Sequence, residues 1–119
     1  MRILVVDDST YLRTRIKTTL EENGHTIVGL AANGEEAIDL ALDLKPDVIT
    51  LDNILPDMSG IDVIKALSGQ LEKTKIVMIS AVGQQSAINE GLESGASDYL
   101  VKPFQDSVLI EIIQNLAKD

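Results

Sequence analysis

Residues 3–8 read Ile-Leu-Val-Val-Asp-Asp, a short apolar run that ends in two carboxylates. Three later segments repeat the pattern of an apolar run followed by a polar side chain: Val-Ile-Thr-Leu-Asp at 48–52, Ile-Val-Met-Ile-Ser at 76–80 and Tyr-Leu-Val-Lys at 99–102. Continuous apolar runs of this length are typical of strands buried on both faces of a parallel sheet. The carboxyl ends of such strands share one sheet edge, where open α/β sheets bind ligands, so these polar residues are expected to gather there.

Amphipathic segments separate the runs, and another apolar run at 27–30 gives a fifth strand. Their apolar residues recur at spacings of three and four, as on one face of a helix. The residues that mark these helices are Leu12, Ile16 and Leu20; Ala37, Ile38, Ala41 and Leu44; Ile61, Ile64 and Leu67; Ile88 and Leu92; and Leu109, Ile112, Ile113 and Leu116. The alternation predicts an α/β fold with a doubly wound, five-stranded parallel sheet, (βα)5.

Length and composition narrow the function classes. At 119 residues and 45% hydrophobic content, the chain is expected to form one soluble domain spanning 1–119. No apolar run approaches the roughly 20 residues that span a bilayer, and the first residues carry no small-residue cleavage site, so we expect neither membrane insertion nor a signal peptide. The absence of cysteine excludes a disulfide framework and a thiolate metal site, which favours a cytoplasmic location. The net charge of −9 argues against direct nucleic-acid binding.

The predicted sheet edge collects three acids, Asp7, Asp8 and Asp52. Two carboxylates about 4 Å apart repel each other by roughly 1 kcal/mol in water and by more at lower dielectric, so a cation or a neighbouring ammonium must offset them. Mg²⁺ suits such a set because it takes octahedral oxygen ligands and keeps open positions for a phosphate. Asp52 stands alone at its strand end and could act as a nucleophile, with Ser80 and Lys102 stabilising a transferring phosphoryl group.

Each residue also has an ordinary structural interpretation. Asp8 or Ser9 could simply cap the following helix. Asp52 could be a plain loop acid, and Ser80 and Lys102 could be structural or solvated side chains. The joint arrangement favours the functional interpretation, because chance seldom places a compatible set of polar groups along one sheet edge.

The chain resembles the receiver domain of two-component response regulators over its whole length. The matching stretches are Leu4-Val5-Val6-Asp7-Asp8-Ser9, residues 47–52 with Leu55-Pro56-Asp57-Met58-Ser59-Gly60, Ser80-Ala81, and Asp98-Tyr99-Leu100-Val101-Lys102-Pro103-Phe104. The resemblance implies a flavodoxin-like fold with strand order 2-1-3-4-5. It also implies that the protein is not an enzyme, but accepts a phosphoryl group and loses it slowly.

The same resemblance assigns roles to individual residues. Asp52 would accept the phosphoryl group from a sensor histidine kinase. The ligands of Mg²⁺ would be Asp7, Asp8, Asp52 and the backbone carbonyl of Ile54. Lys102 would pair with the phosphoryl oxygens, and the Lys102-Pro103 bond would be cis. Ser80 and Tyr99 would form a switch pair that alters the surface made by the helix from about Gln84, the last strand and the last helix.

Residues 80–85 and 102–105 resemble single-domain, CheY-like chemotaxis regulators. This similarity implies a CheA-like kinase as one partner and a flagellar motor switch protein as a downstream target. Residues 49–52 with Leu55-Pro56 also resemble the receiver of chemotaxis methylesterases. Ile54 and Val82 are apolar where the enteric chemotaxis regulator has polar groups, which leads us to hypothesise an unusual lifetime of the phosphorylated form.

Three alternatives stay open at this point. The chain could be the receiver of a longer transcription factor or methylesterase. It could be a small phosphohydrolase that works through an aspartyl phosphate, although such enzymes place a second acid where this chain has Ile54. A flavodoxin-like electron carrier is disfavoured because Asp7 and Asp8 would repel the phosphate of its flavin.

Two residues of the expected switch surface are notable. Gly91 lies inside a predicted helix, which suggests that this helix moves easily. Ile110 is a candidate apolar contact for a partner protein.

Overall fold

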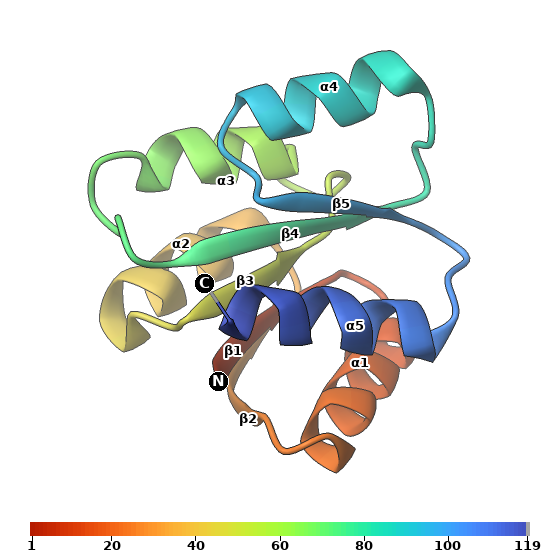
Figure 1. Cartoon of the computed structure of the whole chain (residues 1–119). Helices are drawn as coiled ribbons and strands as arrows, with labels where there is room; N and C mark the ends of the chain where they lie inside the picture. The colour runs from red at the N-terminus through yellow and green to blue at the C-terminus, as the bar shows by residue number, and fades with distance from the viewer. Residues whose placement is uncertain (119) are drawn as a thin grey trace.

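The computed structural model describes residues 1–118 and shows a five-stranded parallel sheet. The strands lie in the order β2-β1-β3-β4-β5, which confirms the predicted topology (Figure 1). Their bounds are β1 Arg2–Val6, β2 Thr26–Ala31, β3 Val48–Leu51, β4 Lys75–Ser80 and β5 Asp98–Val101. The order reverses next to β1, so the crevice between the carboxyl ends of β1 and β3 is the place where such a sheet binds ligands.

Helices cover both faces of this sheet (Figure 1). They are α1 Thr10–Glu22, α2 Gly34–Leu44, α3 Gly60–Leu67, α4 Gln85–Glu93 and α5 Asp106–Ala117. α1 and α5 pack on one face, and α2, α3 and α4 lie on the other. No helix within residues 1–118 combines the length and the apolar character that a membrane crossing requires.

The apolar run in β1 is continuous because alternate side chains enter two different cores. Ile3 and Val5 pack against α1 and α5, whereas Leu4 and Val6 pack against α2 and α3. All four are buried. Successive strand residues point to opposite faces of a sheet, so only a strand covered on both sides needs an unbroken apolar sequence. The two cores hold β1 and its neighbours rigidly and thereby fix the position of the residues that follow them.

The edge strand β2 is less buried than predicted, because the prediction has every strand covered on both faces. Most of its residues are only half-buried, and Leu30 is 41% exposed. The pairing of β1 with β2 shifts register between Ile3 and Leu4. Gly29 fits there because a Cβ atom at this position would lie 3.1 Å from methyl groups of Leu4 and Leu44.

Helix α4 is present as predicted, but its buried residue is not one of the apolar residues that mark the helix in the sequence. Ile88, one of the two apolar residues that mark this helix, is half-buried, and the other, Leu92, is 41% exposed. The buried residue of this helix is Gly91. A Cβ atom there would lie 2.8 Å from Met78 Sδ and 3.2 Å from the ring of Tyr99. The glycine therefore permits close packing of α4 on β4 and β5, which the helical spacing of apolar residues could not indicate.

Candidate functional site

Three carboxylates meet at the carboxyl ends of β1 and β3. Asp7, Asp8 and Asp52 each offer an oxygen, and these oxygens lie within 4.8 Å of one another. Asp7 is 1% exposed and Asp52 is 6% exposed, whereas Asp8 is open to solvent. The predicted gathering of the acids is confirmed. Buried acids beside an exposed one form a pocket with an open side, and an all-oxygen set of this kind fits a hard divalent cation such as Mg²⁺.

Lys102 bridges the two buried acids from the end of β5. Its Nζ donates to Asp7 Oδ2 at 2.8 Å and to Asp52 Oδ2 at 3.1 Å. The Lys102 backbone N–H donates to the Ser80 carbonyl at 2.9 Å, and the Lys102-Pro103 bond is cis as the resemblance implies. The ammonium thus offsets part of the acid repulsion, and three acids against one lysine leave the pocket with an excess of negative charge.

The pocket shifts the pKa values of its members in predictable directions. Burial raises the pKa of Asp52 above its ordinary value, and the nearby charge of Asp7 adds to this effect. The Ile54 N–H and the Lys102 ammonium oppose that rise without cancelling it. Burial alone would lower the pKa of Lys102, but its hydrogen bond to Asp7 and the charges of both acids raise the pKa overall. A bound cation would stabilise the charged form of Asp52 and so lower its pKa.

In the loop after β1, one residue caps the following helix and another presents a carboxylate that can bind a metal. Ser9 caps α1, because its side chain accepts from the Leu12 N–H at 3.2 Å. The Ser9 N–H in turn donates to Asp7 Oδ1 at 2.8 Å. Within residues 1–118, Asp8 makes no hydrogen bond or ion pair. Of the two candidate caps, Ser9 is therefore the actual one, and the Asp8 carboxylate is available to a ligand.

The loop after β3 presents Ile54 at the rim of the pocket. The Ile54 N–H donates to Asp52 Oδ1 at 3.1 Å. The Ile54 side chain is 61% exposed. No hydrogen bond to its carbonyl oxygen is found among the described residues, so this oxygen is free to serve as the predicted metal ligand.

Ser80 and Tyr99 are linked through the backbone of Val82. The Val82 N–H donates to Ser80 Oγ at 3.2 Å, and the Tyr99 hydroxyl donates to the Val82 carbonyl at 2.6 Å. Ser80 is fully buried and Tyr99 is half-buried. The sequence indicates Val82 only as an apolar neighbour of the pocket. Its bridging role depends on a backbone carbonyl, which every residue type carries, and so no sequence signal could have revealed it.

Two further residues near the site were missed by the sequence reasoning. Arg13 Nη1 donates to the backbone carbonyl of Asp7 at 2.6 Å. Asp57 accepts from the N–H groups of Gly34 and Glu35 at 2.7 and 3.0 Å. Arg13 could have been suspected from its place in the first turn of the helix that follows the acids. The Asp57 contact joins segments that are far apart in the sequence, so no local sequence pattern indicates it.

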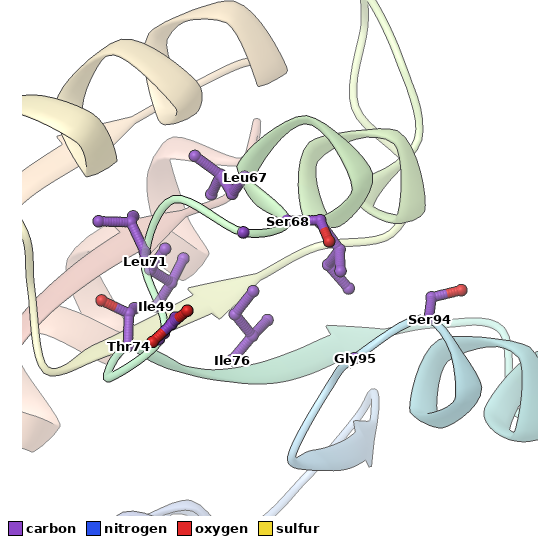
Figure 2. A pocket seen from close by; sticks show the side chains of 11 residues that line it. Ile49, Leu67, Ser68, Leu71, Thr74, Ile76, Ser94 and Gly95 are labelled. Carbon is purple, nitrogen blue, oxygen red and sulfur yellow. The ribbon is translucent and has the colours of Figure 1, made fainter.

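A separate cavity of about 200 Å³ lies at the opposite edge of the sheet. Its floor includes Ile49 and Ile76 near the amino ends of β3 and β4, and Leu67, Leu71 and Thr74 border it (Figure 2). None of the polar residues discussed above lines this cavity. It is therefore distinct from the acid pocket and contributes nothing to the chemistry there.

Comparison with known proteins agrees with this geometry. The family model described as the response regulator receiver domain matches residues 3–114. The chain belongs to the response regulator receiver family. As a receiver domain homologous to CheY proteins, it is a non-enzymatic phosphoryl acceptor with an acidic pocket formed by Asp7, Asp8 and Asp52.

Individual relatives and solved structures refine the comparison. The receiver is 39% identical to the chemotaxis protein CheY of Thermotoga maritima over 117 residues, which cover 98% of each chain. It is 42% identical to a protein-glutamate methylesterase/protein-glutamine glutaminase of Idiomarina loihiensis over 109 residues, which cover 89% of this chain but 28% of that protein. Among solved structures, the CheX-CheY-BeF3-Mg²⁺ complex of Borrelia burgdorferi matches with a TM-score of 0.94 at 27% identity, covering 98% of this chain and 89% of that one.

Proposed function

We propose that Asp52 accepts a phosphoryl group from a sensor histidine kinase in a reaction that depends on Mg²⁺. The observation that carries this proposal is the set of three carboxylates with oxygens within 4.8 Å, two of them bridged by Lys102. Asp7, Asp8, Asp52 and the carbonyl of Ile54 are the proposed ligands of the cation. The bound cation would supply positive charge next to the transferring phosphoryl oxygens.

The chain's own residues then perform the transfer. A carboxylate oxygen of Asp52 attacks phosphorus, and the bond from phosphorus to the donor breaks with the electron pair leaving on the donor. Lys102 already contacts Asp52 Oδ2 and can follow the negative charge onto the phosphoryl group. The Ile54 N–H holds the other carboxylate oxygen and so limits rotation of the Asp52 side chain.

The proposed signal runs from Ser80 through Val82 to Tyr99. A phosphoryl oxygen on Asp52 would attract the Ser80 hydroxyl, which would then loosen its contact with the Val82 N–H. The carbonyl of the same residue holds the Tyr99 hydroxyl, so a shift of this segment moves the tyrosine. Tyr99 packs against Gly91 of α4, and the altered surface comprises α4, β5 and α5.

The relatives support chemotaxis as the pathway. On the strength of the similarity to CheY proteins over nearly the whole chain, we propose that residues 1–119 act as a single receiver domain in the cytoplasm. The proposed partners are a CheA-like kinase and a downstream protein such as a flagellar motor switch protein. The alternative is a receiver that belongs to a longer methylesterase, which the partial match to such proteins keeps open.

The direct test uses a small phosphodonor. The protein is incubated with acetyl phosphate and Mg²⁺, and its mass is measured intact. We expect the mass of one added phosphoryl group, and we expect none when EDTA removes the cation. A protein that stays unmodified while a known receiver is modified in the same buffer would contradict the proposal.

The lifetime of the phosphorylated form should depend on the apolar rim. Ile54 is 61% exposed and Val82 is half-buried, and we hypothesise that these two apolar side chains limit the access of an attacking water to the pocket. We expect Ile54→Asn and Val82→Glu to change the dephosphorylation rate by about tenfold, equivalent to about 1.4 kcal/mol in activation free energy. The rate is measured as loss of the phosphorylated mass after removal of the donor. Ile54→Leu keeps the apolar character and should leave the rate unchanged; equal rates in all three variants would refute the hypothesis.

A further inference from the structure

The loop between β3 and α3 is a closed turn that carries Ile54. The Gly60 N–H donates to the Asn53 carbonyl at 2.7 Å, and the Leu55 N–H donates to the Met58 carbonyl at 3.2 Å. These two bonds flank the pair Ile54 and Ser59, which face each other as an antiparallel bridge. In such a bridge the backbone groups of the central pair point away from the turn. The turn therefore leaves the Ile54 carbonyl free, and its orientation depends on how the turn as a whole is held.

The tip of this turn is fixed to the N-terminus of α2. Both carboxylate oxygens of Asp57 are used, one by the Gly34 N–H at 2.7 Å and one by the Glu35 N–H at 3.0 Å. Met58 packs directly on Gly34, where any Cβ atom would collide with the Met58 side chain. We call this set of contacts the Asp57 tie. It joins the turn to an element that contributes none of the acids in the pocket.

Capping of α2 alone does not explain the tie. The helix has its own N-cap, Asn33, whose side chain accepts from the Glu36 N–H at 2.9 Å. The Glu36 carboxylate in turn accepts from the Ala32 N–H at 3.2 Å. The two hydrogen bonds from Gly34 and Glu35 also lower the pKa of Asp57, so the carboxylate stays charged at neutral pH. A local cap is thus already present, and Asp57 adds a connection across 23 residues of sequence.

We propose that Asp57 is a positioning residue for the metal site, because it anchors the turn that aims the Ile54 carbonyl at the acid pocket. This inference rests on the proposed function and deepens it. Groups that orient a metal ligand commonly contribute 10-fold to 100-fold to metal affinity. The Asp57 tie also couples the pocket to the N-terminus of α2. This helix is not part of the switch surface formed by α4, β5 and α5.

The test measures Mg²⁺ affinity by calorimetric titration of the whole chain. We expect Asp57→Ala to weaken Mg²⁺ binding by about tenfold, and Asp57→Asn to give an intermediate value because its amide oxygen still accepts one hydrogen bond. Asn33→Ala is the matched control, since it removes another cap of α2 without touching the turn. Circular dichroism spectra confirm that each variant is folded before titration.

The outcomes separate this inference from the proposed function. A wild-type protein that binds no Mg²⁺ contradicts the proposed function itself. A wild-type protein that binds Mg²⁺, with Asp57→Ala binding equally well, contradicts only the tie. Equal weakening by Asp57→Ala and Asn33→Ala also overturns it, because the effect would then come from the stability of α2. If Asp57→Ala and Asp57→Asn weaken Mg²⁺ binding equally, the charge of Asp57 alone explains the effect. The proposed anchoring role is then overturned as well.

A second readout uses the reciprocity of coupled binding. If the tie strengthens Mg²⁺ binding by a given factor, Mg²⁺ must strengthen the tie by the same factor. Hydrogen exchange at the Gly34 and Glu35 amides should therefore slow when Mg²⁺ is added. The Asp62 amide, which donates to Ser59 Oγ in the cap of α3, provides a nearby reference. Unchanged exchange at Gly34 and Glu35 at saturating Mg²⁺ would refute the coupling.

Discussion

Replacement of Asp52 with Asn should abolish the phosphoryl gain from acetyl phosphate and Mg²⁺ while the chain stays folded. Asn is nearly the same size and can still accept from the Ile54 N–H, but its amide is a poor nucleophile at phosphorus. Intact mass spectrometry measures the effect, and wild type treated in parallel shows the expected gain. Asp39→Asn serves as the control, because this exposed acid makes no hydrogen bond or ion pair within residues 1–118. Phosphoryl gain by Asp52→Asn would place the acceptor elsewhere.

The same variant should be more stable than wild type in EDTA at neutral pH. Burial raises the pKa of Asp52 above its ordinary value of 3.8, so the folded state binds this proton more readily than the unfolded state. Ionisation then costs stability as pH rises from 3.8 through the folded pKa, and the cost is complete above it. Asn carries no charge and avoids the cost. Urea unfolding at neutral pH and at pH 3 checks the sign: the advantage of Asp52→Asn should shrink at the acid end.

Removal of the Lys102 ammonium should have the largest effect on stability. Lys102→Ala leaves two buried acids without their common partner, and loss of one member of a buried ion pair costs about 3 kcal/mol. We expect this loss in urea unfolding with EDTA present. Because the raised pKa of Lys102 lies above 10.5, the contribution is complete below that pH and disappears as pH rises through the folded pKa.

Mg²⁺ should recover part of the loss in Lys102→Ala, because the cation replaces the missing positive charge and binds only the folded state. Lys17→Ala is the matched control. Its partner Glu21 is 3.2 Å away, both side chains are more than 40% exposed, and such a pair contributes about 0.3–0.5 kcal/mol. A Lys102→Ala variant that loses no more stability than Lys17→Ala would show that the acids do not depend on this ammonium.

The sheet and the acid pocket could be predicted because they follow from periodicity and topology. Continuous apolar runs such as 3–6 identify strands covered on both faces, and parallel strands bring their carboxyl ends to one edge whatever their distance in sequence. Asp7 and Lys102 are separated by 95 residues and still meet within 2.8 Å. The switch roles of Ser80 and Tyr99 are implied by family resemblance alone, and they stay predictions until variants are tested.

The remaining features depend on contacts that a linear pattern does not encode. Asp8 and Ser9 are both good caps, and only the conformation of the loop selects Ser9. The apolar spacing that marks α4 does not identify its buried residue, because that residue is Gly91, which packs closely on Met78 and Tyr99. The Asp57 tie joins two loops through backbone N–H groups, which carry no residue identity.

The contacts of Tyr99 have a practical consequence for optical measurements. The chain has no tryptophan and two tyrosines, so its intrinsic ultraviolet fluorescence comes from Tyr99 and from Tyr11, which is 72% exposed. In a Tyr11→Phe variant, Tyr99, whose ring lies beside Gly91, would be the single tyrosine fluorophore. Its emission intensity and quenching by iodide would then follow the environment of β5 in real time, with no dye attached.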